Sequence, residues 1–218
     1  QPAGIAADAM FIRRVYLDVI GTLPTPDEAR RFLDSQENDK RAKLVDELLE
    51  RPEFAHFWAL KWADVLRGSD VTISKRGVFS FHRYLVDLFR NDRPFDEFAR
   101  ETVTGLGNTL YNPPANFFRV ARTPDEMAEA VSQLFLGVRI NCAKCHNHPF
   151  ESITQNDYYG LAAYFARVKF KGTQFDLDDE IVYLDRLAEV RRLLTAPRAA
   201  PATLSTVRHG ERRLATEA

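Results

Sequence analysis

The tetrapeptide Thr-Pro-Asp-Glu occurs twice in this 218-residue chain, at residues 25–28 and 123–126. In each copy the threonine precedes a proline, and a glutamate follows three residues after the threonine. This is the pattern of a capping box with proline at the first helical position, so each copy predicts the start of a helix. Thr154 and Asp157 predict a third start. The residues that flank the two copies differ, so they do not indicate a structural repeat.

Apolar residues recur at helical spacing along most of the chain, which predicts a mostly α fold. We expect a compact multi-helix domain over residues 1–172 and an irregular extension or linker over residues 173–218. Residues 105–123 are expected to be irregular, and residues 181–184 to form a strand. The expected helices cover residues 9–20, 26–32, 41–49, 52–66, 77–90, 95–103, 124–137 and 155–168.

Charge and hydropathy exclude some classes of partner. A net charge of −1 gives no reason to expect binding to nucleic acid or to an acidic membrane. No apolar run approaches the roughly 18 residues of a transmembrane helix. The arginine-rich tail is interpreted as a solvated linker or arm.

Because the chain begins with Gln1, we expect a processed product or an excised segment.

Both cysteines and two of the five histidines lie in the stretch NCAKCHNHPF, residues 141–150. Cys142, Cys145 and His146 form C-x-x-C-H, the attachment pattern of c-type haem. Two thiols about one helical turn apart suit the two vinyl groups on one edge of the porphyrin, and the adjacent imidazole suits the iron. The sequence therefore predicts haem c, with thioether bonds to both cysteines and His146 as the proximal iron ligand.

Two other interpretations of the cysteine pair stay open. Cys142, Cys145 and His148 could bind a metal such as zinc, although the adjacent Cys145 and His146 would crowd one tetrahedral ion and no second C-x-x-C is present. The pair could also be a redox dithiol, although the strand and helix pattern of a thioredoxin is missing.

The second axial position of a haem iron needs a ligand from elsewhere or stays open. His82 lies on an apolar helical face and is the preferred distal ligand. Met127 is a weaker alternative, because it also lies on an apolar face and carries a thioether. His56 and His209 are less favoured.

Aromatic residues after the motif have two interpretations. Tyr158, Tyr159 and Phe165 could pack against haem or could equally be core residues. His148 could orient a haem propionate, bind a neighbouring cofactor or cap the turn before Pro149.

Four blocks of the chain resemble a known family, and the last of them, which contains C-x-x-C-H, is the most specific. They are FIRRVYLDVIGTLPTPDEARRFL (Phe11–Leu33), KLVDELLERPEFAHFWALKWADVLR (Lys43–Arg67), PPANFFRV (Pro113–Val120) and QLFLGVRINCAKCHNHPFESITQNDYYGLAAYFARV (Gln133–Val168). Over about residues 8–172 the chain resembles the planctomycetal cytochrome-associated domain family of unknown function, number 1549 in its series.

Members of this family look like pieces of large exported proteins, often beside a separate cytochrome c-like domain and followed by a long partner domain. The resemblance implies a periplasmic or cell-envelope location, and a redox partner protein or C-terminal partner domain. It assigns Cys142 and Cys145 as thioether sites and His146 as the proximal ligand. After Gly172 the sequence departs from the expected connecting segment, so we expect a fragment or a separate partner polypeptide.

The expected function is a cytochrome-like module that passes single electrons to a partner, rather than a stand-alone enzyme. Export also follows from the haem chemistry, because covalent attachment is completed outside the cytoplasm and no other cysteine competes for disulfides. A haem enzyme with an open distal site, acting on peroxide or an organic substrate, is one alternative. A non-haem module whose cysteines bind metal or form a disulfide is another.

Overall fold

Helices dominate the computed structural model, which describes residues 4–173 and 179–185 and confirms the mostly α prediction. No helix within these ranges has the length and apolar character needed to cross a membrane. The α-helices are α1 (Asp8–Ile20), α2 (Pro26–Asp34), α3 (Lys40–Leu49), α4 (Pro52–Val65), α5 (Asp70–Arg90), α6 (Phe95–Thr104), α7 (Asn116–Val120), α8 (Pro124–Phe135) and α9 (Gln155–Phe165). The 3₁₀ helices are η1 (Pro113–Ala115) and η2 (Asn141–Lys144), and the strands are β1 (Gly107–Asn108), β2 (Val168–Gly172) and β3 (Glu180–Leu184).

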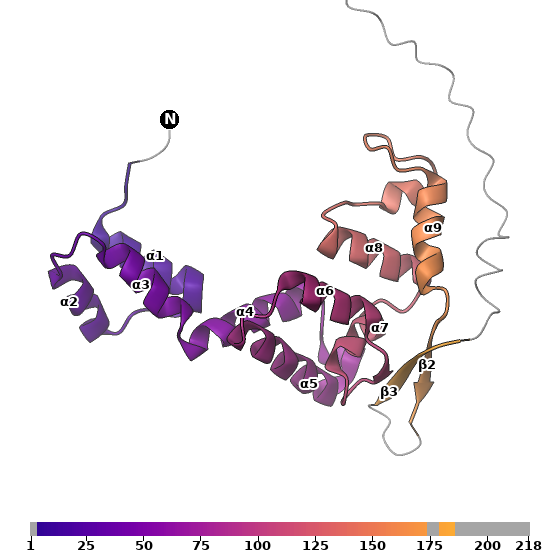
Figure 1. Cartoon of the computed structure of the whole chain (residues 1–218), viewed down its shortest axis with the longest axis horizontal. Coiled ribbons are helices and arrows are strands. Elements are labelled where there is room, and N and C mark those ends of the chain that lie inside the picture. The colour runs from indigo at the N-terminus through magenta and orange to yellow at the C-terminus, as the bar shows by residue number, and fades with distance from the viewer. Residues whose placement is uncertain (1–3, 174–178, 186–218) are drawn as a thin grey trace, which may run out of the picture.

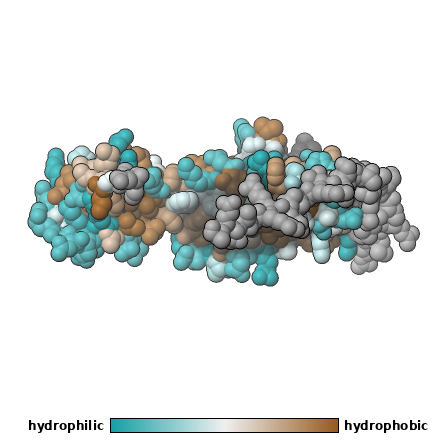
Figure 2. Space-filling model, turned by 90° about the horizontal axis from the view of Figure 1, so that it is seen from above, coloured by the Kyte–Doolittle hydropathy of each residue, from teal (hydrophilic) through white to brown (hydrophobic). Residues whose placement is uncertain are grey.

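The helices form two lobes that α4 connects. Helices α1 to α3 enclose a small core of their own at one end of the molecule (Figure 1). From above, the outline narrows between this lobe and the larger one (Figure 2). At the junction, Gly21 adopts φ 73°, and a Cβ there would lie 2.2 Å from the Phe57 ring of α4. Trp58 of α4 also donates to the carbonyl of Val19 at 3.2 Å, so α1 and α4 meet through specific contacts.

The larger lobe has a core rich in aromatic rings. Helix α4 packs along α5, and α8 packs against α9. Phe81 of α5, Phe98 of α6 and Phe118 of α7 are each at most 2% exposed, so three successive helices contribute to one core.

All three predicted capping boxes are present. The hydroxyls of Thr25, Thr123 and Thr154 each accept a backbone N–H three residues later, and the acidic side chain at that position accepts the N–H of the threonine. These bonds satisfy N–H groups that a helix start would otherwise leave unpaired.

Some predicted boundaries were wrong. Helix α5 begins at Asp70 rather than at residue 77, after a capping box of Ser69 and Thr72, and it contains a kink at Ser74. The segment expected to be irregular includes β1, η1 and α7. The last helix ends at Phe165, and Val168 instead begins a strand.

A small antiparallel sheet joins β2 and β3 to β1, which lies between α6 and η1 of the larger lobe. Its strand order is β1-β3-β2, with Phe170 of β2 and Gly107 of β1 both opposite Val182 of β3. The predicted strand at residues 181–184 is therefore confirmed. Residues 179–185, expected to be part of the extension, belong to the fold, because β3 is the central strand. The arginine-rich tail and His209 lie outside the described residues.

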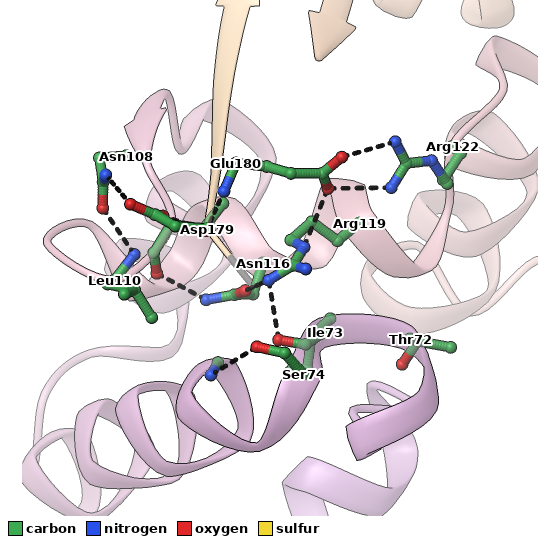
Figure 3. A network of polar contacts seen from close by, with 12 residues as sticks. Thr72, Ile73, Ser74, Asn108, Leu110, Asn116, Arg119, Arg122, Asp179 and Glu180 are labelled. Atoms are coloured by element: carbon green, nitrogen blue, oxygen red, sulfur yellow. Dashed lines mark hydrogen bonds and ion pairs between the residues drawn. The ribbon is translucent and has the colours of Figure 1, made fainter. Parts of the chain in front are cut away.

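A buried arginine connects this sheet to the kink in α5 (Figure 3). Arg119 of α7 is 8% exposed, and its Nε donates to the Glu180 carboxylate at 3.0 Å. Its Nη1 donates to the carbonyl of Ile73 at 2.7 Å, next to Ser74, which has φ 63° and ψ 162°. Positive φ at a non-glycine residue costs on the order of 1–3 kcal/mol and persists only where surrounding contacts fix it. Arg119 supplies one such contact.

Two further residues complete the connection (Figure 3). Arg122 donates to both oxygens of Glu180 at 3.0 Å, and this bond lowers the pKa of Glu180 below its ordinary value although burial acts in the opposite direction. Asp179 is 7% exposed and accepts from the side chains of Asn108 and Thr109. Asp179 and Glu180, two acidic residues of the predicted extension, are therefore internal anchors of β3.

We predict that Arg119→Met lowers the free energy of unfolding by about 1–3 kcal/mol, because it leaves the Ile73 carbonyl without its buried donor, while Glu180 keeps only its bonds to Arg122. Arg30→Met is the matched control, since Arg30 pairs with Asp27 on the surface and such pairs contribute about 0–1 kcal/mol. Urea unfolding curves measure both values. Equal small losses in the two variants would contradict the anchoring role of Arg119.

Candidate functional site

The C-x-x-C-H motif forms a short turn that exposes both of its cysteines. Cys142 lies in η2, and Cys145 is the first residue after the end of η2. Both cysteines are free and exposed. Ala143 between them is fully buried and donates its N–H to the Ile140 carbonyl at 2.8 Å. The turn is therefore anchored through its small residue, while the two thiols remain available to a ligand.

His146 has one ring nitrogen fixed by its own turn. Its Nδ1 lies 2.7 Å from the backbone carbonyl oxygen of Asn147. A carbonyl oxygen only accepts, so Nδ1 carries the proton and donates. The neutral ring then has its free electron pair on Nε2, which is the form that binds a metal ion.

His148 has the opposite arrangement. Its Nδ1 accepts the backbone N–H groups of Phe150 at 3.3 Å and of Glu151 at 3.0 Å. His148 therefore caps the turn that follows Pro149, whereas the predicted cap was of the turn before Pro149. The Phe150 ring lies 6.4 Å from the His148 ring and is 91% exposed.

Helix α8 holds the motif from one side. Glu129 accepts from the Asn141 side chain at 2.8 Å and from the Tyr158 hydroxyl at 2.7 Å. Lys144 pairs with Asp125 at 2.9 Å, and this bond raises the pKa of Lys144, which keeps the amine charged. Both ends of η2 are thus tied to carboxylates of one helix.

Helix α9 holds the motif from the other side. The Lys144 carbonyl accepts from the Gln155 side chain at 3.0 Å and from the Tyr159 hydroxyl at 3.2 Å. The Gln155 backbone N–H also donates to the Asn147 side chain at 3.0 Å. Sequence reasoning missed Glu129 and Gln155, because Asn141 lies 12 residues from Glu129 along the chain and Lys144 lies 11 residues from Gln155.

The aromatic residues expected near a haem divide into two groups. Tyr158 is fully buried, and its pKa is raised by burial and by its bond to Glu129, so it stays protonated as a donor. Phe165 is 8% exposed and packs against Phe118. Both are core residues in this structure, whereas Tyr159 is half-buried and contacts the motif directly.

The residues expected to supply a distal ligand, His82 and Met127, do not lie on the exposed surface around the motif. His82 is half-buried on α5, and its ring stacks on His56 of α4 with the ring centroids 6.3 Å apart. Figure 1 shows α5 in a different part of the lobe from α9 and the loops before it. Met127 is fully buried in the core side of α8. The structure brings neither His82 nor Met127 to the exposed face of the motif.

The donor set of the motif fits a covalently bound haem. The two thiols are exposed on one turn, and the Nε2 electron pair of the next residue is free. Apolar side chains are exposed on both sides of the motif along the chain, since Leu136 is 62% exposed and Phe150 is 91% exposed.

The same geometry is less suited to the zinc alternative. His148 already uses Nδ1 to accept two backbone N–H groups. Within residues 4–173 and 179–185, no group of three or more histidine, cysteine or acidic side chains is arranged to hold a metal ion.

A polar cavity lies beside the motif. It has a volume of about 250 Å³ and lies between α8 and the end of α4. Arg67, Glu126, Glu129 and Asn141 are among its lining residues. The Glu129 carboxylate, which holds Asn141 of the motif, therefore also borders a cavity that solvent can enter.

The fold and this site define a mostly α-helical protein that displays a tethered C-x-x-C-H turn. Residues 1–170 match the model of the PSCyt2 family, described as a protein of unknown function (DUF1549). The match covers most of the chain, so the protein belongs to this family. No curated protein and no solved structure matches the chain.

We predict that Glu129→Leu lowers the free energy of unfolding by about 1–3 kcal/mol, because the Tyr158 hydroxyl is left buried without a partner. Hydrogen exchange of the backbone amides of residues 141–146 should also become faster. Asp125→Asn is the control, because it breaks a partly exposed pair worth at most about 1 kcal/mol.

A double variant tests the cause of this loss. Glu129→Leu combined with Tyr158→Phe removes both partners, so it should recover part of the stability lost in Glu129→Leu. A double variant that loses the sum of the two single effects would show that the hydrogen bond is not responsible.

We predict that His82 makes the stability depend on pH. Burial, together with the nearby His56, lowers the pKa of His82 below its ordinary value of 6.5. The folded state therefore binds this proton less readily than the unfolded state, and the contribution of His82 is fully present above pH 6.5. It is lost as the pH falls from 6.5 through the folded pKa.

Urea unfolding at about pH 7.5 and about pH 5, on either side of the histidine titration range, measures this contribution. The loss of stability on acidification should be smaller in His82→Gln than in the wild type. An equal loss in both proteins would contradict the prediction.

Proposed function

We propose that this protein is a c-type cytochrome-like module that binds haem covalently and passes single electrons to a partner. Cys142 and Cys145 form the thioether bonds, and His146 ligates the iron through Nε2. The observation that carries the proposal is the turn itself, which exposes both thiols and has the adjacent imidazole in the metal-binding tautomer. The partner is a redox protein or a C-terminal domain, and the location is the periplasm or cell envelope.

Attachment needs no oxidant and no leaving group. Each thiol adds its S–H bond across one vinyl group, with sulfur bonding to one carbon and hydrogen to the other. The thiols must be reduced when this occurs, and both cysteines are free in the structure. When bound, haem supplies the one-electron chemistry, while the protein supplies the ligand, the apolar contacts and the surroundings that set the potential.

The contacts around η2 support a fixed orientation of the ligands. Carboxylates from α8 hold Asn141 and Lys144, and side chains from α9 hold the Lys144 carbonyl. A turn held at both ends keeps the thiols and the imidazole in one arrangement, which reduces the reorganisation that electron transfer or ligand binding requires.

One observation favours a second candidate function, a haem enzyme with an open distal position. His82 lies on α5, in a different part of the lobe from α9, and Met127 is fully buried in the core side of α8, so neither expected distal ligand is presented on the exposed face of the motif. Open iron would bind peroxide or an organic substrate. Carbon monoxide distinguishes the two functions, because it changes the spectrum of reduced haem when the sixth position is open and leaves it unchanged when a strong protein ligand fills that position.

We predict that expression with export and haem-maturation machinery yields a protein with a covalent haem. A pyridine haemochrome spectrum should show haem c, and the intact mass should rise by one haem per chain. The variant with both Cys142→Ala and Cys145→Ala should lose the covalent adduct and keep its helical circular dichroism. An unmodified wild-type mass without a haem band would contradict the proposal.

A further inference from the structure

His148 has a ring nitrogen fixed as an acceptor, so its other nitrogen is left as a donor. Nδ1 accepts from the backbone of Phe150 and Glu151 at 3.3 and 3.0 Å. An accepting nitrogen carries no proton, so the proton of the neutral ring lies on Nε2. The ring therefore presents an N–H group on the side opposite to the loop that it caps.

The two histidines of the motif thus have different chemistry, although they are two residues apart. His146 donates from Nδ1 to the Asn147 carbonyl and keeps an electron pair on Nε2, which suits a metal ion. His148 keeps a hydrogen on Nε2, which suits an anionic oxygen. The Asn147 carbonyl only accepts, so it determines the tautomer of His146. The backbone N–H groups of Phe150 and Glu151 only donate, so they determine the tautomer of His148.

The loop fixes the position of the His148 donor. The His148 N–H donates to the Ile153 carbonyl at 2.8 Å and closes the loop, while the ring bonds to two further backbone groups. The ring is half-buried, so part of its surroundings is protein rather than water. A donor held in this way has little conformational freedom left to lose when it binds an acceptor.

We propose that His148 binds a carboxylate through Nε2–H, and that this carboxylate is a propionate of the haem. The proposal rests on the proposed function. The order of the chain supports it, because Cys142 and Cys145 suit the vinyl edge of a porphyrin and His146 suits the iron at its centre. His148 comes next along the chain, and the propionates leave the porphyrin from the edge opposite the vinyl groups.

His148→Asn separates this role from the capping role. The asparagine oxygen can accept the backbone N–H groups two and three residues later, which is the bonding pattern of His148 in the loop. Its amide nitrogen takes the place of a ring carbon and ends one bond short of Nε2. The variant should therefore keep the loop and lose the donor at the position of Nε2.

The test uses the full chain with Cys142→Ala and Cys145→Ala, titrated with haemin or with haemin dimethyl ester. The ester lacks the charged carboxylates and is otherwise the same porphyrin. We expect this chain to bind haemin roughly tenfold tighter than the ester, as a charge-assisted hydrogen bond predicts. Adding His148→Asn should reduce the ratio to about one, with unchanged helical circular dichroism.

Three results overturn the inference. A preference for haemin that survives His148→Asn would show that His148 only caps the loop, and an equal affinity of the parent for both porphyrins would show that no carboxylate is recognised. If the thiol-free chain binds neither porphyrin, resonance Raman spectra of covalently loaded wild type and His148→Asn test the inference instead. Identical propionate bands in the two proteins would overturn the inference. These results leave the proposed function standing wherever the wild type carries covalent haem, whereas a wild type without haem overturns both.

Discussion

The pairing of Arg119 with Glu180 is the constraint on which the larger lobe depends. Arg119 is buried in α7, and it binds the first residue of β3 on one side and the carbonyl next to the kink in α5 on the other. A buried ion pair adds little net stability compared with apolar packing, and Glu180 also binds Arg122. The pair therefore acts mainly by fixing which segments meet, and it joins residues far apart in the chain through a single side chain.

The C-x-x-C-H turn has its own fixed surroundings at the other side of the lobe. Glu129 links the first residue of η2 to the core through Tyr158, and α9 begins with Gln155 bonded to the carbonyl of Lys144. The rigid parts of α8 and α9 thus determine where the motif lies. An exposed pair of thiols on a mobile loop would be equally reactive, but it would not present the thiols and an imidazole in one arrangement.

The sequence predicted those features that depend only on residues close together in the chain. The capping boxes at Thr25, Thr123 and Thr154 were predicted because each is complete within four residues. The identity of the motif was likewise local. The contact of Arg119 with Glu180 spans 61 residues and could not be predicted from spacing. The strand at residues 181–184 was predicted, but its place between β1 and β2 was not, because those partners lie far away along the chain.

The proposed chemistry of the site depends most on the opposite tautomers of His146 and His148. Long-range nitrogen–proton correlation spectra of the apoprotein, recorded at a pH where both rings are neutral, measure them directly. The structure predicts a proton on Nδ1 of His146 and on Nε2 of His148, with exchange at the His146 Nδ1 proton slowed by its bond to the Asn147 carbonyl. The same tautomer in both rings, or rapid averaging of both, would contradict the account.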